Sequence, residues 1–176
     1  RRQPAPKKED AFYGSPDITQ DDIRARWPWE EEHRILGEDQ LRGAECLVIE
    51  SRHHDPHYYL SRRVTWVERR HFLDLHEEQF DRQGRLFKVI DKAWQQVAPW
   101  SYWAWSYWNV INLAQKSRSI YQCYDWLMDQ GVPDKEFSTK ELEKEVVWRE
   151  PRSPIPPVNG PAARPPAPAI RWGLGG

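Results

Sequence analysis

The stretch YYLSRRVTWVERRHFLDLHEEQFDRQGRLFKVI, residues 58–90, decides the fold. Its first segment, residues 59–67, is rich in β-branched and aromatic side chains, which favour strands. Residues 72–80 and 86–90 follow after a charged turn and a reversal at Gly84, which accepts a positive φ without steric strain. Because charged side chains occur all along these segments, they predict antiparallel strands of a curved sheet with one wetted face, and not a buried parallel sheet.

Further strand-like runs flank this stretch on both sides. A hairpin is predicted around a turn bounded by Gly37 and Gly43. Short helices are expected after Thr19 and Ser138, whose hydroxyls can cap a first helical turn. The chain is therefore mainly β, of the α+β class, with about seven or eight antiparallel strands. The predicted strands outside the central stretch span residues 32–36, 45–50, 92–97, 102–113 and 119–128.

Proline content and charge divide the chain into parts. Residues 1–32 form an extended approach with one short helix, 33–150 hold the antiparallel β domain, and 151–176 are a Pro- and Gly-rich tail. Such a tail cannot bury a core of its own, so we expect it to be disordered or laid on a partner through Trp172. The chain begins at Arg1 without an initiator Met or a signal peptide, so we expect a mature form or a piece of a longer protein.

Tryptophan is the unusual feature of the composition, with 11 among 176 residues. Large aromatic side chains in excess indicate a core of rings, a partner interface or a site for apolar matter. In residues 102–108, strict alternation puts Trp103 and Trp105 on one strand face and Trp108 on the other. Not all of these rings fit inside so small a chain, so we expect Trp100, Trp103 and Trp108 to contact a partner.

Charge and cysteine content exclude several classes of function. The net charge of −1 argues against a nucleic-acid surface or a polybasic membrane anchor. No apolar run is long enough to span a bilayer as a helix. The histidine-rich segment 51–57 contains a proline and no accompanying ligand motif, which favours an exposed loop over a metal site. Cys46 and Cys123 fit a disulfide and a pair of buried thiols about equally.

The sequence shows no catalytic constellation. Ser61 and Ser101 lack the Gly-x-Ser-x-Gly turn that exposes a nucleophile. Glu77 and Glu78 are adjacent on a predicted strand, so their carboxylates point to opposite faces and cannot act as a pair. We therefore expect a protein that is not an enzyme and holds no metal.

Several segments, taken in order, resemble motifs of one known family. They are FYGSPDITQDDI (12–23), GAECLVIE (43–50), RVTWVE (63–68) with EQFDRQGRLFK (78–88), and VPDKEFSTKEL (132–142). In this order and spacing the chain is similar to the C-terminal half of the outer-membrane lipoprotein-sorting proteins with the LolA/LolB-like fold. The similarity is to the branch often associated with bacterial lipid-exporter-type membrane pumps.

The resemblance implies a half-open antiparallel β-barrel wrapped around a helix, with an apolar concave face that holds acyl chains. Family members are periplasmic carriers, some associated with the outer membrane, and they need no cofactor. The implied partners are a lipid or the acyl chain of a lipoprotein, and a membrane transporter or larger protein assembly. The side chains expected in the groove, or in the core beneath it, are Val64, Trp66, Leu73, Leu75, Phe87, Val89 and Trp105.

A second interpretation gives the same fold a different role. The chain would be a structural accessory subunit of a larger, membrane-associated complex, and the tryptophan-rich residues 100–108 and the tail would contact other proteins. A carrier should be monomeric and contain extractable lipid, whereas such a subunit should occur only within its complex.

Overall fold

The structure of the protein is a computed structural model, which describes residues 7–12, 15–24, 26–97, 102–123, 126, 128, 131, 133–142 and 144. The chain divides into two compact units, Arg1–Met128 and Asp129–Gly176. Trp100, Trp172 and the tail from residue 151 onward lie outside the described residues, so the predictions made for them stay predictions.

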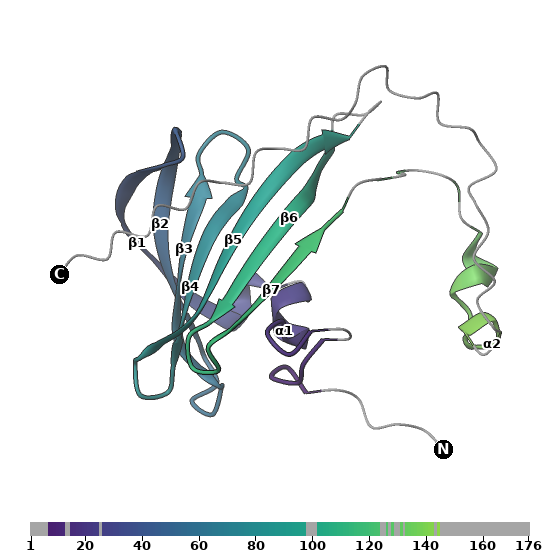
Figure 1. Cartoon of the computed structure of the whole chain (residues 1–176), viewed down its shortest axis with the longest axis horizontal. Coiled ribbons are helices and arrows are strands. Elements are labelled where there is room, and N and C mark those ends of the chain that lie inside the picture. Colours follow the sequence, from purple (N-terminus) through teal and green to yellow (C-terminus); the bar gives the residue numbers. More distant parts are fainter. Residues whose placement is uncertain are drawn as a thin grey trace. The chain divides into compact units, whose positions relative to one another are not determined.

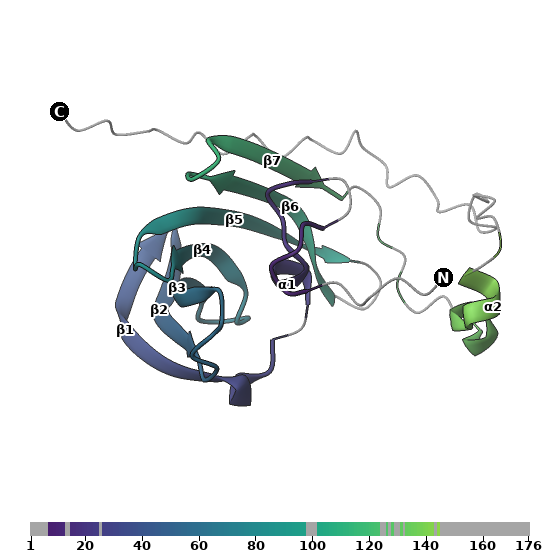
Figure 2. The ribbon, with the colours of Figure 1, turned by 90° about the horizontal axis from the view of Figure 1, so that it is seen from below.

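The described part of the first unit forms one antiparallel sheet. Its seven strands pair strictly in chain order, so β1 and β7 are the two edges. The sheet curls around a concave face without closing between these edges (Figures 1 and 2). This confirms the predicted curved antiparallel sheet of a half-open barrel. The strands are β1 (Glu31–Leu41), β2 (Ala44–His53), β3 (Leu60–Glu68), β4 (Asp74–Asp81), β5 (Leu86–Val97), β6 (Tyr102–Asn112) and β7 (Ser117–Gln122).

The first hairpin is longer than the sequence pattern predicted. β1 runs through most of the expected loop, and a register shift between Ile35 and Gly37 accommodates an extra residue. The strand then reverses at Arg42 and Gly43, whose φ angles are 53° and 82°. Positive φ at both central residues is the two-residue turn that matches the twist of paired strands.

Helix α1 (Gln20–Ile23) lies on the concave side of the sheet (Figure 2). It begins after Thr19, as predicted, and the Asp22 carboxylate accepts hydrogen bonds from the Thr19 backbone N–H at 2.7 Å and hydroxyl at 2.9 Å. The short 3-10 helix η1 (Pro28–Glu30) connects α1 to β1. One cluster of buried apolar side chains sits beside α1 and includes Ile18, Ile90, Trp108 and Val110.

The described residues of the second unit hold two short helical elements, η2 (Asp134–Phe137) and α2 (Thr139–Leu142). The Ser138 hydroxyl accepts a hydrogen bond from the Glu141 backbone N–H at 3.3 Å. This confirms Ser138 as the residue that caps the second predicted helix.

Candidate functional site

The concave face carries buried charged and polar side chains that the sequence pattern did not predict. Glu77 and Gln79 of β4 and Lys88 of β5 are 1%, 0% and 1% exposed. Asp22 of α1 joins them, because its carboxylate accepts hydrogen bonds from Lys88 Nζ at 2.8 Å and Gln79 Nε2 at 2.7 Å. This buried charge network, which also includes Arg26, fixes α1 to the middle of the sheet.

Arg26 extends the network toward η1. Its NH1 lies 2.9 Å from Glu77 Oε2, and its NH2 lies 3.8 Å from Asp21 Oδ2 and 3.7 Å from Asp22 Oδ1. Burial alone would raise the pKa of Glu77, but Arg26 and the nearby cations Arg63 and Lys92 hold that pKa well below its usual range. The carboxylate therefore stays ionised, and the segment after α1 stays paired to β4.

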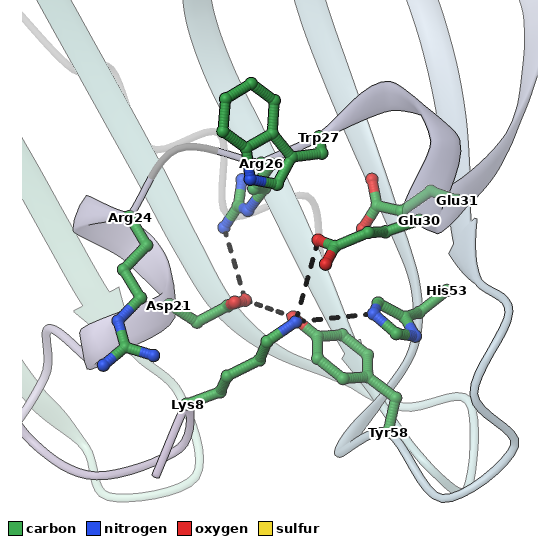
Figure 3. Close-up of a pocket in the computed structure, with 9 residues that line it drawn as sticks. All are labelled: Lys8, Asp21, Arg24, Arg26, Trp27, Glu30, Glu31, His53 and Tyr58. Atoms are coloured by element: carbon green, nitrogen blue, oxygen red, sulfur yellow. Dashed lines mark hydrogen bonds and ion pairs between the residues drawn. The ribbon is translucent and has the colours of Figure 1, made fainter. Parts of the chain in front are cut away.

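A polar pocket lies on one side of α1 (Figure 3). Within it, the Asp21 carboxylate accepts a hydrogen bond from the Tyr58 hydroxyl. Lys8 reaches across to His53 Nε2 at 3.4 Å and Glu30 Oε2 at 3.9 Å. Most of the charged side chains that line the polar pocket are thus paired with one another. The pocket has a volume of about 190 Å³. The lining residues are Lys8, Asp21, Arg24, Arg26, Trp27, Glu30, Glu31, His53 and Tyr58.

An aromatic pocket, with a volume of about 320 Å³, includes α1, β5, β6 and β7 in its walls. The charged side chains in its wall have partners, because Lys92 Nζ donates to Asp74 and Lys88 Nζ donates to Asp22. Lys92 Nζ also lies 4.5 Å from the centre of the Trp108 ring. The pocket therefore offers mainly apolar surface. Its lining residues are Phe12, Ile18, Asp22, Ile23, Asp74, Lys92, Trp94, Trp105, Trp108 and Tyr121.

A β-bulge in β6 builds this pocket. Ala93 pairs with Tyr107 but Trp94 pairs with Trp105, so Ser106 is an extra residue in the ladder. Beyond such a bulge, the alternation of side chains between the two faces of the strand is shifted by one residue. Trp105 and Trp108 therefore both line the aromatic pocket, with ring centres 5.6 Å apart. The prediction from strict alternation, which put them on opposite faces, is wrong for this reason.

The structure does not bring the predicted groove residues together. Of that set, Trp105 lines the aromatic pocket. Trp66 points to the face away from α1, where its Nε1 donates to Asp39 at 2.9 Å and its ring contacts His76. Val64, two residues before Trp66 on β3, is buried on that same face.

The other predicted groove residues are half-buried at separate places in the sheet or, for Leu73, just before a strand. Leu75 and Phe87 are extra residues at the register shifts of β4 and β5. Leu73 precedes β4 and its backbone carbonyl accepts a hydrogen bond from the Glu68 N–H at 2.8 Å. Val89 pairs with Glu78 and Ile111 in the middle of the sheet.

The predicted partner-contact residues are also separated. Trp108 is 9% exposed and belongs to the core, because it pairs with Lys92 on the same face as the buried Val110. Trp103 is half-buried, with its ring centre 4.8 Å from that of His71. An exposed aromatic pair that the sequence reasoning missed flanks Pro28: Trp27 and Trp29 are 52% and 70% exposed and stack with ring centres 4.9 Å apart.

The described residues hold no group of three or more His, Cys, Asp or Glu placed to bind a metal ion. His53 of the histidine-rich loop instead stacks on Tyr58, with ring centres 4.2 Å apart. Cys46 is buried and Cys123 is half-buried, and no disulfide joins these two residues. In the described part of the chain, no helix is long and apolar enough to cross a membrane.

Comparison with known proteins gives a family and a fold. A protein family described as "Uncharacterized protein" matches residues 1–144 of the chain. No curated protein matches it.

Solved structures share the architecture. A domain from Vibrio parahaemolyticus, described as that of an outer membrane lipoprotein-sorting protein, has 22% identity and a TM-score of 0.68, covering 78% of this chain and 58% of that one. A DUF1329 family protein from Desulfovibrio piger has 23% identity and a TM-score of 0.71, covering 81% and 60%. A LolA superfamily protein from Nitrosomonas europaea has 18% identity and a TM-score of 0.61, covering 80% and 64%.

The present chain spans less than two thirds of each of these solved chains. At these levels of identity the likeness shows the fold, which is LolA-like, as the sequence motifs predicted.

Proposed function

Because the chain belongs to the family of uncharacterized proteins that matches residues 1–144 and has a LolA-like fold, we propose that it is a non-enzymatic carrier that binds an acyl chain in the aromatic pocket. The acyl chain would be that of a lipid or a lipoprotein, and the carrier would work in the bacterial periplasm. The observation that carries the proposal is the pocket wall, which is aromatic and aliphatic apart from charged side chains that already have partners.

The size of the pocket favours one chain segment over a whole lipid. Its volume of about 320 Å³ is at the lower end of the range for small-molecule sites, about 300–1,000 Å³. Burying each methylene contributes about 0.8 kcal/mol, so affinity should rise about fourfold per carbon until the pocket is full. Further carbons should then add little.

The description of one structural neighbour supports a proposal about the partner of such a carrier. One of the solved structures is described as an outer membrane lipoprotein-sorting protein domain. A carrier of this kind receives its cargo from one site and delivers it to another, so a membrane transporter or a larger assembly is the expected partner.

The test is a titration of the purified protein with linear fatty acids of increasing length, in which binding is monitored by intrinsic tryptophan fluorescence. Trp105→Ala should weaken the binding of octanoic acid about tenfold, because it removes apolar wall. Trp103→Ala is the matched control, since Trp103 lies on the same strand and does not line the pocket. An affinity that does not depend on chain length, or equal losses in the two variants, would contradict the proposal.

One observation favours the alternative role as an accessory subunit. The stacked pair Trp27 and Trp29 is largely exposed, which is typical of the aromatic anchors of protein interfaces. Native mass spectrometry with lipid extraction of the same sample separates the two roles. A single chain with a lipid-sized adduct supports the carrier, and a chain found only with other subunits and without lipid supports the accessory subunit.

A further inference from the structure

We infer that the aromatic pocket recognises a carbonyl oxygen at the end of the aliphatic chain, through the indole N–H of Trp108 and the hydroxyl of Tyr121. This inference rests on the proposed function and adds the chemical class of the ligand. Both side chains line the pocket. Among the described residues, Trp108 Nε1 and the Tyr121 hydroxyl are buried and have no hydrogen-bond partner.

The sheet places these two groups side by side. Trp108 of β6 and Tyr121 of β7 are direct partners in the antiparallel register. Side chains of such a pair project from the same face and lie close together, with Cβ atoms about 4.5–5.5 Å apart. Two donors that project from adjacent positions can therefore converge on one acceptor atom.

Buried polar groups in native proteins nearly always have partners, so a cross-strand pair without any needs an explanation. The other buried polar atoms without partners in the described residues are Arg26 Nε, Arg63 NH1 and Gln79 Oε1. Each of these three side chains, the two arginines and the glutamine, already has an ion-pair or hydrogen-bond partner through another of its polar atoms. Trp108 and Tyr121 are different, because each has one polar atom and that atom is unpaired.

The chemistry of the two groups defines the ligand. An indole N–H can only donate, and a phenol hydroxyl can also donate. A carbonyl or carboxylate oxygen has two lone pairs and can accept from both. Since Asp74 holds Lys92 and Asp22 holds Lys88, the pocket offers no unpaired lysine to demand a full negative charge. An ester of a lipid and the carboxylate of a free fatty acid share this oxygen.

The experiment compares octanoic acid, methyl octanoate and octane, each titrated into the whole chain and followed by tryptophan fluorescence. We expect the two oxygen-bearing ligands to bind more tightly than octane. Tyr121→Phe keeps the ring and removes the hydroxyl, so it should weaken the binding of those two ligands about 2- to 10-fold and leave octane unchanged. Tyr107→Phe, one residue before Trp108 and outside the pocket wall, should change none of them.

The outcomes separate this inference from the proposed function. Equal affinity of octane and both oxygen-bearing ligands for the unmodified protein would overturn carbonyl recognition and leave acyl-chain binding intact. An equal loss for all three ligands in Tyr121→Phe would also overturn it. Failure of every ligand to bind would overturn both. Tighter binding of the acid alone would assign the carboxylate, and tighter binding of acid and ester would assign the shared carbonyl.

Discussion

The ion pair between Lys88 and Asp22 should be the strongest single tie between α1 and the sheet. Lys88 Nζ lies 2.8 Å from Asp22 Oδ2, and the two side chains are 1% and 0% exposed. Replacing Lys88 with Met preserves much of the apolar stem but leaves the Asp22 carboxylate buried without its cation. Breaking a buried pair in this way costs about 3–5 kcal/mol. The carboxylate still accepts from Gln79 and Thr19, so we expect the lower end of this range.

A second substitution tests whether the loss comes from unpaired charge. Asp22→Asn alone leaves the Lys88 ammonium buried without its anion and should also cost about 3 kcal/mol. The double variant Lys88→Met with Asp22→Asn buries neither charge, and the Asn amide oxygen can still accept from Gln79. We expect it to lose only about 1 kcal/mol, which makes the coupling energy between the two sites much larger than the error of additivity, about 0.5 kcal/mol.

The free energy of unfolding would be measured by urea titration, followed by tryptophan fluorescence and circular dichroism. Arg85→Met, which removes an exposed partner of Asp81, is the matched surface control and should leave the midpoint unchanged. Additive losses in the double variant would refute the reasoning, because they would mean that Lys88 and Asp22 stabilise the fold independently of each other.

The remaining predictions concern His76 and a turn. Burial lowers the pKa of His76, but its hydrogen bond to Asp91 and the nearby Glu78 carboxylate raise that pKa overall from 6.5 to about 9. Between these two pH values the folded state therefore binds one proton more than the unfolded state. The contribution of His76 to the free energy of unfolding, up to about 3 kcal/mol, should be fully present below about pH 6.5 and be lost as the pH rises through 9. His76→Asn should abolish this slope in pH-dependent urea titrations, and a slope that persists would contradict the assignment. Gly84→Ala should lower the free energy of unfolding by about 1 kcal/mol, because the φ of Gly84 is +76°. Gly37→Ala is the control and should be nearly neutral. Since a Cβ atom would meet no neighbour within 4 Å at either site, equal effects would exclude the backbone conformation as the cause.

Much of the fold could be predicted from local patterns. The order of the antiparallel strands, the reversal at Gly84 and the helix starts after Thr19 and Ser138 all depend on residues close in the sequence. β-branched runs, a glycine that tolerates positive φ and a hydroxyl that caps a helix act over a few residues. The order of longer motifs also identified the LolA-like fold.

The candidate site depended on contacts between distant residues. A single bulge at Ser106 puts Trp105 and Trp108 on the same face of β6. The sequence near Ser106 does not predict this bulge, because it arises from the pairing of β6 with β5. Lys88 has the charge of a wetted strand face, yet it is buried because Asp22, 66 residues earlier, meets it on the concave side. Alternation along one strand determines which side chains share a face. Strand register and charge pairing between distant residues determine which of those side chains are buried.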